Sequence, residues 1–223
     1  METLIAWMVA IMMAAAPHYT SYVPEAVETP AEMKERYEDI AKDIVNVVYD
    51  PEETPLYNGA RGRARSASTV LAIAYFESSF RKAVDKNLGK EGRGDHGRSW
   101  CLMQLNIGEG KTADGWSGPE LIEDRTKCIR SAYRYIKMSF GACRGLPIED
   151  RLSAYASGRC MTPSIASRRR LNVSSMWFYK APSVNDDIVI SELFPSHQDE
   201  EQVFSLETYP PSTTSQPLLL TIF

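Results

Sequence analysis

Glu77 is the residue whose neighbours in the sequence best suit proton-transfer chemistry. It follows an unbroken apolar run, Val70 to Phe76, and a helix that is apolar all round is expected to be buried. An apolar setting disfavours a charged carboxylate, and so does the negative end of a helix that stops there. Both effects favour the protonated group that a general acid for glycosidic cleavage must carry. The alternative is a buried structural glutamate paired with an arginine.

The cysteines suit disulfide bonds better than a metal site. The four cysteines form no Cys-x-x-Cys pair and there are only three histidines, so we expect no metal site and no cofactor. The chain also lacks the Gly-x-Ser-x-Gly segment of many serine hydrolases. An even number of cysteines suits two disulfides formed in an oxidising compartment. We favour Cys101–Cys128 with Cys143–Cys160, although the spacing alone does not choose among the pairings. Four buried free thiols are the alternative.

Three segments resemble the motifs of goose-type lysozymes and soluble lytic transglycosylases. They read AYFESSF at residues 74–80, GDHGRSWCLMQLN at 94–106 and SAYASG at 153–158. The family has Glu-Ser at a helix end, Gly-Leu-Met-Gln on a following strand and Ala-Tyr-Asn-x-Gly on a later helix, in the same order. The resemblance covers roughly residues 33–180. It implies a peptidoglycan lytic transglycosylase or goose-type lysozyme (muramidase), which cleaves the MurNAc-GlcNAc β-1,4 bond.

The resemblance also implies roles for individual residues. Glu77 matches the catalytic acid, and Asp95 matches the aspartate that goose-type enzymes are thought to use in positioning water. The positions that match glycan-binding residues are Ser78, Met103, Gln104 and Tyr155.

Three positions depart from the family pattern. Cys101 replaces the glycine before Leu-Met-Gln, Ala156 replaces the asparagine after the tyrosine, and Asn106 replaces a second aspartate often found in goose-type enzymes. The first two changes favour an alternative, a catalytically weakened glycan-binding module on the same fold.

Asp95 bears on which reaction follows proton transfer. An inverting hydrolase needs a second carboxylate about 6.5–9.5 Å from the acid to activate water. A lytic transglycosylase needs none, because the resemblance implies attack by the 6-hydroxyl of the muramic acid itself. Asp95 could supply the second carboxylate. It could instead brace a turn, since Asp-His-Gly is common turn chemistry. Both reactions therefore remain open.

Hydrophobic periodicity predicts a helical domain over residues 33–180, with an N-terminal apolar segment and linker at 1–32 and an acidic Pro/Ser/Thr-rich tail at 181–223. The fold class is mainly α (α+β, lysozyme-like), a helical bundle around a buried central helix with a small irregular β-region. That central helix is expected to begin at Ser66 or Ser68, and residues 102–105 look like a strand. The other predicted helices begin at Thr29-Pro30 or span 123–140, 148–156 and 164–179.

The N-terminal apolar run, Leu4 to Ala16, is too short to span a bilayer as a helix. It is either the apolar part of a secretion signal or a buried first helix of the domain, and no Lys or Arg precedes Lys34. We expect a protein of the cell envelope, secreted or phage-associated, with no stable membrane span.

The net charge of −4 hides an uneven distribution, because residues 1–180 hold 25 basic and 22 acidic side chains. A body of charge +3 suits an anionic polymer such as cell wall. The arginines at 61, 63 and 65 could contact such a polymer or simply be solvated. Together with the run at 168–170 they suggest a nucleic-acid binder, but these segments belong to no recognised nucleic-acid-binding module. We therefore expect peptidoglycan glycan strands as the partner, no nucleic acid, and a monomer.

Overall fold

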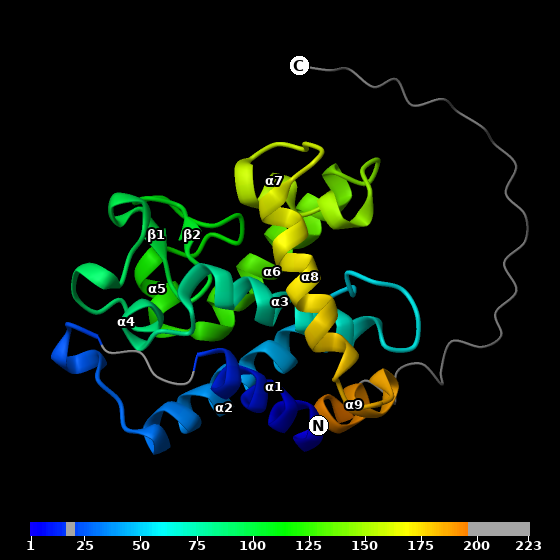
Figure 1. The fold of residues 1–223 in the computed structure, drawn as a ribbon, viewed down its shortest axis with the longest axis horizontal. Coiled ribbons are helices and arrows are strands. Elements are labelled where there is room, and N and C mark those ends of the chain that lie inside the picture. The colour runs from blue at the N-terminus through cyan, green and yellow to red at the C-terminus, as the bar shows by residue number, and fades with distance from the viewer. Residues whose placement is uncertain (17–20, 196–223) are drawn as a thin grey trace, which may run out of the picture.

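The structure is a computed structural model that describes residues 1–16 and 21–195. The described chain is mainly helical with one small two-stranded sheet, which confirms the predicted fold class. Helix α3 (Gly62–Ser78) runs through the middle of the molecule, and other helices surround it (Figure 1). Its residues from Val70 to Ala74 are completely buried, as expected for a helix without a polar face.

Helix α3 begins at Gly62, before the predicted start at Ser66 or Ser68. Ser66 and Ser68 lie inside the helix, and the Ser66 hydroxyl donates to the carbonyl oxygen of Gly62 (2.7 Å). The prediction that either serine caps the helix is therefore wrong. The first turn is satisfied from a distant part of the chain instead, because a carboxylate oxygen of Asp186 accepts from the backbone N–H of Arg63 (2.9 Å).

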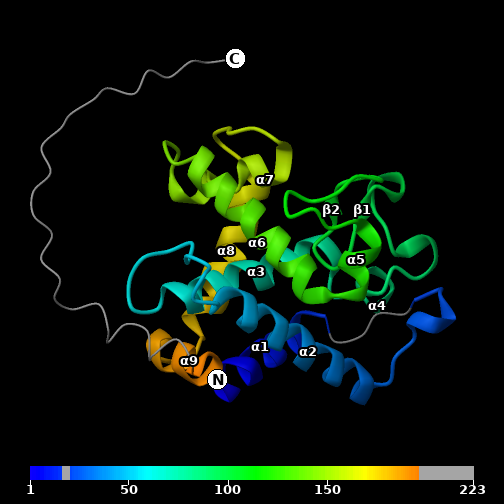
Figure 2. The same ribbon diagram turned by 180° about the vertical axis from the view of Figure 1, so that it is seen from behind.

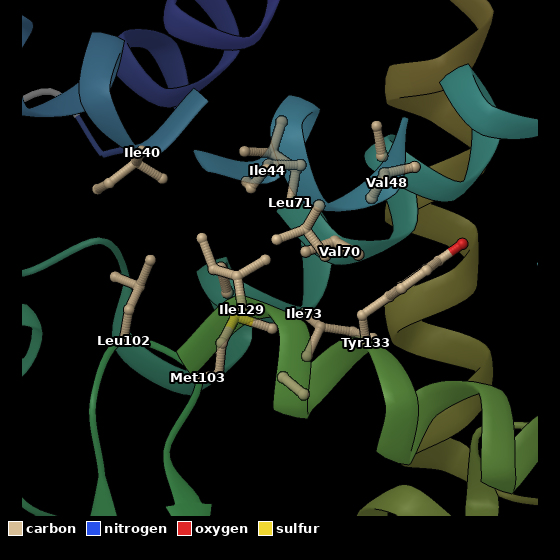
Figure 3. Close-up of a cluster of buried hydrophobic side chains, with 14 of the residues drawn as sticks. Ile40, Ile44, Val48, Val70, Leu71, Ile73, Leu102, Met103, Ile129 and Tyr133 are labelled. Atoms are coloured by element: carbon tan, nitrogen blue, oxygen red, sulfur yellow. The ribbon is translucent and has the colours of Figure 1, made fainter. Parts of the chain in front are cut away.

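The core forms where α3 meets α2 (Pro30–Val48) and α6 (Arg125–Ala142). Figure 3 shows aliphatic side chains from these helices meeting the hairpin residues Leu102 and Met103. Each fully buried aliphatic side chain of this size stabilises the fold by roughly 1.5–3 kcal/mol. The hairpin is therefore held to the helices by the same core that fixes the end of α3.

Helix α2 begins where the sequence predicts. Thr29 Oγ1 accepts from the backbone N–H of Glu32 (3.2 Å), and the Glu32 carboxylate accepts in turn from the backbone N–H of Thr29 (2.8 Å). This is a capping box, with Pro30 at the first helical position where its missing N–H costs nothing.

The N-terminal apolar run forms α1 (Glu2–Ala15), which lies along α2 (Figure 2). Leu4, Met8 and Met12 are completely buried against the domain, and the Tyr37 hydroxyl donates to the Ala16 carbonyl oxygen (2.9 Å). This arrangement is the one expected of a buried first helix. Among residues 1–16 and 21–195, no helix combines the length and apolarity needed to cross a membrane.

The sheet consists of β1 (Ser99–Trp100) and β2 (Leu105–Asn106), paired antiparallel with Trp100 opposite Leu105. The strand expected over residues 102–105 is therefore wrong for most of its length, since residues 101–104 form the connection of the hairpin. Cys101 and Gln104 have left-handed backbone conformations, with φ of 60° and 47°. These values suit a tight connection and not an extended strand.

The remaining helices carry the later parts of the chain. The helix expected at 123–140 is α6, preceded by the short α5 (Gly118–Glu123). The region at 148–156 divides into a 3-10 turn, Ile148–Asp150, and α7 (Ser153–Ser157), which ends at Gly158 with φ of 75°. Helix α8 (Ile165–Tyr179) begins at Ser164 as predicted and crosses α3. The short α4 spans Lys82–Asp85.

Residues 181–195 belong to the folded body, although they were expected to be part of the tail. Helix α9 (Asp186–Leu193) packs beside the start of α1 (Figures 1 and 2), where Glu192 binds the amino group of Met1 at 2.9 Å. Asp186 accepts from the Tyr49 hydroxyl at 2.9 Å, and Val189 is buried. The rest of the expected tail, residues 196–223, lies outside the described residues.

Both disulfides that we favour are present in the structure. Cys101 is bonded to Cys128, and Cys143 is bonded to Cys160. The first joins the hairpin to α6, and the second joins the end of α6 to the loop after α7. Both therefore secure segments that carry the motifs.

Candidate active site

A cavity of about 660 Å³ opens where the three motif segments meet. The end of α3, the hairpin, α6, α7 and α8 all contribute to its wall. Four of the predicted site residues line it, and they are Glu77, Asp95, Gln104 and Tyr155. Its size lies within the range of roughly 300–1,000 Å³ that is usual for small-ligand sites.

Glu77 reaches this cavity from the last turn of α3. The helix ends at Ser79, and both Ser79 and Phe80 adopt left-handed conformations, with φ of 49° and 54°. Arg36 stabilises this sharp exit, because its guanidinium donates to the Phe80 carbonyl oxygen (2.8 Å). The Glu77 side chain is 21% exposed. It therefore stands at the wall of the cavity, accessible to a ligand.

Arg170 of α8 pairs with Glu77, and its Nη2 atom lies 2.7 Å from Glu77 Oε1. This pair corresponds in part to the structural alternative for Glu77, except that the carboxylate is half-buried in a cavity wall. The guanidinium holds this carboxylate oxygen in place. The sequence did not single out Arg170, because it lies in the run Arg168-Arg169-Arg170, outside the three motif-like segments.

Asp95 braces the hairpin and also lines the cavity. Its Oδ2 atom accepts from Ser99 Oγ (2.7 Å) and from Asn106 Nδ2 (3.1 Å), one residue on each strand. Its own φ of 49° confirms the tight-turn interpretation of Asp-His-Gly. The carboxylate is exposed and faces the cavity that Glu77 faces, so bracing does not remove it from the site.

Gln104 joins the two halves of the second motif. Its Oε1 atom accepts from the backbone N–H of Gly94 (2.7 Å), and its Nε2 atom donates to the Cys101 carbonyl oxygen (3.0 Å). A Cβ at Gly94 would lie only 2.7 Å from Gln104 Oε1. A glycine at this position is therefore a steric requirement for the Gln104 contact.

Tyr155 closes the site from α7. Its hydroxyl donates a long hydrogen bond to the Met103 carbonyl oxygen (3.4 Å), which links the second and third motifs. Burial of the ring, and then the negative charge of Glu77, raise the pKa of Tyr155, while Arg170 partly opposes the shift. The phenol therefore keeps its proton at neutral pH and serves as a hydrogen-bond donor.

Ser78 and Met103 do not line the cavity. Ser78 is 1% exposed, and its hydroxyl donates to the Ala74 carbonyl oxygen (2.7 Å) and accepts from the Phe80 N–H (3.2 Å). Met103 has no exposed surface and packs in the core. In this structure the two side chains support the site from behind.

Helix α6 supplies cavity residues that sequence reasoning missed. Tyr135, Met138 and Ala142 line the wall, and Met138 is 61% exposed. Their spacing of three and four residues places them on one side of the helix, away from its core residues Ile129, Ala132 and Ile136. This periodicity could have revealed them once the core face of α6 was known.

No protein-family model, curated protein or solved structure matches the chain. The three motif-like segments and the cavity that they line are therefore the features of the chain that bear on its function.

The arginines that could have bound an anionic polymer are largely engaged within the protein. Arg61 donates to the carbonyl oxygens of Ala181 and Pro182, both at 2.9 Å, and Arg168 binds the Asp150 carboxylate at 2.7 Å. Arg65 lies over the ring of Tyr57 at 4.1 Å. Within the described ranges, no group of three or more His, Cys, Asp or Glu side chains is arranged to hold a metal ion.

Proposed function

We propose that the protein cleaves the β-1,4 bond between MurNAc and GlcNAc in the glycan strands of peptidoglycan, with Glu77 as general acid/base. The supporting observation is that Glu77, Gln104 and Tyr155, far apart in the sequence, line a single cavity. Each comes from a different motif-like segment, and the three segments have the order of those in lysozymes of goose type. This activity would place the protein in the cell envelope, secreted or phage-borne.

In this proposal the Glu77 carboxyl group donates its proton to the glycosidic oxygen, and the bond to the anomeric carbon breaks. If water attacks, Asp95, which lines the same cavity, takes its proton. If the 6-hydroxyl of the muramic acid attacks, the Glu77 carboxylate takes the proton of that hydroxyl. Tyr155 donates a hydrogen bond near the carboxylate and does not exchange its proton.

The deciding experiment compares wild type with Glu77→Gln in a turbidity assay on purified cell walls. We expect the variant to lose lysis while its far-UV circular dichroism and melting temperature stay those of the wild type, because glutamine has the same shape and carries no acidic proton. Glu109→Gln is the matched control, since Glu109 has a side chain 89% exposed and does not line the cavity. Retained lysis in Glu77→Gln would refute the proposal.

A second candidate is a glycan-binding module without turnover. The ion pair between Arg170 and Glu77 favours it, because the pair occupies one oxygen of the carboxyl group that would act as the acid, and Ala156 places no polar side chain at its position in the cavity wall. This candidate predicts that wild-type protein sediments with purified cell walls yet releases no soluble fragments from them. Release of fragments that depends on Glu77 would exclude it.

A further inference from the structure

We infer that Arg170 is a positioning residue for Glu77, which fixes one carboxylate oxygen so that the other faces the bond to be cleaved. The inference depends on the proposed function of Glu77 as a general acid/base. Nothing in the motif-like segments points to Arg170, because it lies outside all three of them. Its role is suggested by how its guanidinium is held in the cavity wall.

The Arg170 guanidinium is held from two helices. Its Nη1 atom donates to the Ala166 carbonyl oxygen one turn earlier in α8 (3.2 Å), and its Cζ atom lies 5.5 Å from the ring centre of Phe76 in α3. The side chain is only 16% exposed. A guanidinium that is packed and hydrogen-bonded in this way loses little additional freedom when it binds a carboxylate.

The helix that carries Arg170 is itself firmly anchored. Arg168 makes two hydrogen bonds to the Asp150 carboxylate (2.7 and 2.8 Å), and the same carboxylate accepts from the backbone N–H of Ser164 at the start of α8 (3.0 Å). Asp150 has no exposed surface. This network fixes the start of α8, and the Ser68 hydroxyl of α3 donates to the buried Ser174 carbonyl oxygen of α8 (2.8 Å). The position of Arg170 relative to α3 is therefore fixed, as a catalytic site requires.

The two oxygens of Glu77 are in different situations. Oε1 accepts from Arg170 Nη2 at 2.7 Å, whereas Oε2 accepts no hydrogen bond from any side chain or backbone group in residues 1–16 and 21–195. A proton on Oε2 can therefore be directed to the glycosidic oxygen. Once that proton has left, Arg170 stabilises the negative charge that remains on the carboxylate. The same pair holds the carboxylate in place for the return of a proton.

Arg169 offers a matched control. It lies next to Arg170 and stacks on the same Phe76 ring, with a distance of 5.3 Å from its Cζ atom to the ring centre. It makes no ion pair with Glu77, and it does not line the cavity. Removing Arg169 therefore takes away the same charge and a similar stacking contact but leaves the Glu77 carboxylate bound.

The experiment measures kcat and KM on a soluble glycan-strand oligomer for wild type, Arg170→Gln, Arg170→Lys and Arg169→Gln. A misplaced acid slows the chemical step more than it weakens binding, so we expect kcat of Arg170→Gln to fall about 10- to 100-fold. We expect its KM to stay within about twofold of the wild-type value. Arg170→Lys, which retains a positive donor, should recover part of kcat, and Arg169→Gln should behave as wild type.

Each outcome gives a definite answer. An unchanged kcat in Arg170→Gln would overturn the positioning role while leaving the proposed function in place. An equal loss in Arg170→Lys and Arg170→Gln, together with an equal fall in melting temperature, would assign Arg170 to the fold alone and overturn the inference. A wild-type protein that cleaves no glycan would overturn the proposed function and the inference together.

Discussion

The disulfide between Cys101 and Cys128 joins the hairpin that carries Gln104 to the helix that carries Tyr135 and Met138. Cys101 stands where the resembling family has glycine, and it keeps a left-handed backbone with φ of 60°. That conformation costs a residue with a Cβ roughly 1–2 kcal/mol. The disulfide ties this left-handed position to Cys128, which is completely buried in α6.

Removing this disulfide should destabilise the protein substantially. The bonded residues are 27 apart in sequence, and the loop-entropy relation gives a loss of about 3.5 kcal/mol for Cys101→Ala with Cys128→Ala. Urea unfolding followed by circular dichroism measures the change. The matched variant, Cys143→Ala with Cys160→Ala, has a separation of 17 and should lose about 3 kcal/mol. If the first double variant lost less than about 1 kcal/mol, the stabilising role of the Cys101–Cys128 bond would be wrong.

Asp95 should contribute to the stability of the hairpin as well as to the site. Asp95→Ala removes both hydrogen bonds from Ser99 and Asn106, and we expect a loss of about 1 kcal/mol because the carboxylate is exposed. Asp95→Asn keeps an oxygen acceptor and should lose less. Thermal unfolding of the two variants tests this order. Equal stability of Asp95→Ala and wild type would contradict the bracing role.

The same Asp95→Asn variant distinguishes the two reactions by its products. Mass spectrometry of digested peptidoglycan shows reducing ends after hydrolysis and anhydro-muramyl ends after transglycosylation. If Asp95 activates water, reducing ends should disappear in Asp95→Asn while wild type produces them. Anhydro ends at the same level in both proteins would limit Asp95 to the hairpin.

The sequence was sufficient to predict the features that local chemistry determines. The start of α2 at Thr29-Pro30, the start of α8 at Ser164 and the burial of α3 all follow from short-range patterns, and the structure confirms them. The features that could not be predicted from the sequence depend on contacts between residues far apart in the chain. The start of α3 is set by Asp186, more than a hundred residues away, so nearby serines gave the wrong boundary.

The candidate site shows the same division. The motif-like segments pointed to Glu77, Asp95, Gln104 and Tyr155 as site residues. These four residues line one cavity. Arg170 remained unnoticed because an arginine in a basic run gives no local sign of its partner. Ser78 does not line the cavity, because its hydroxyl donates to the Ala74 carbonyl oxygen one turn earlier in α3.

Tyr133 should make the protein sensitive to alkaline conditions. Burial raises the pKa of Tyr133 to about 12, and its hydroxyl donates to the Thr54 carbonyl oxygen (3.0 Å). Because the pKa is higher in the folded state, stability is complete below about pH 10 and is lost as the pH rises toward 12. A shift of two units corresponds to roughly 2–3 kcal/mol. Tyr133→Phe should show a shallower decline in urea-unfolding free energy above pH 10, and an unchanged slope would contradict this.

Asp150 should make the protein sensitive to acid, because it holds the start of the helix that carries Arg170. Hydrogen bonds from Arg168 and then from Thr162 hold the pKa of Asp150 well below its ordinary value, while burial opposes them. A carboxylate with a lowered pKa stabilises the fold above the unfolded-state value, about 3.9, and that contribution is lost as the pH falls through the folded-state pKa.

Asp150→Asn should therefore be less stable than wild type at pH 7, with a difference that shrinks below about pH 4, where the unfolded wild-type chain takes up a proton that the folded Asp150 does not yet bind. Urea unfolding at a series of pH values measures this difference, with the exposed Asp187→Asn as control. Because the network around Asp150 also fixes α8, kcat on soluble glycan should fall in Asp150→Asn even at temperatures where the variant stays folded. A stability difference that is constant from pH 7 to pH 2 would show that Asp150 acts through packing and not through its charge.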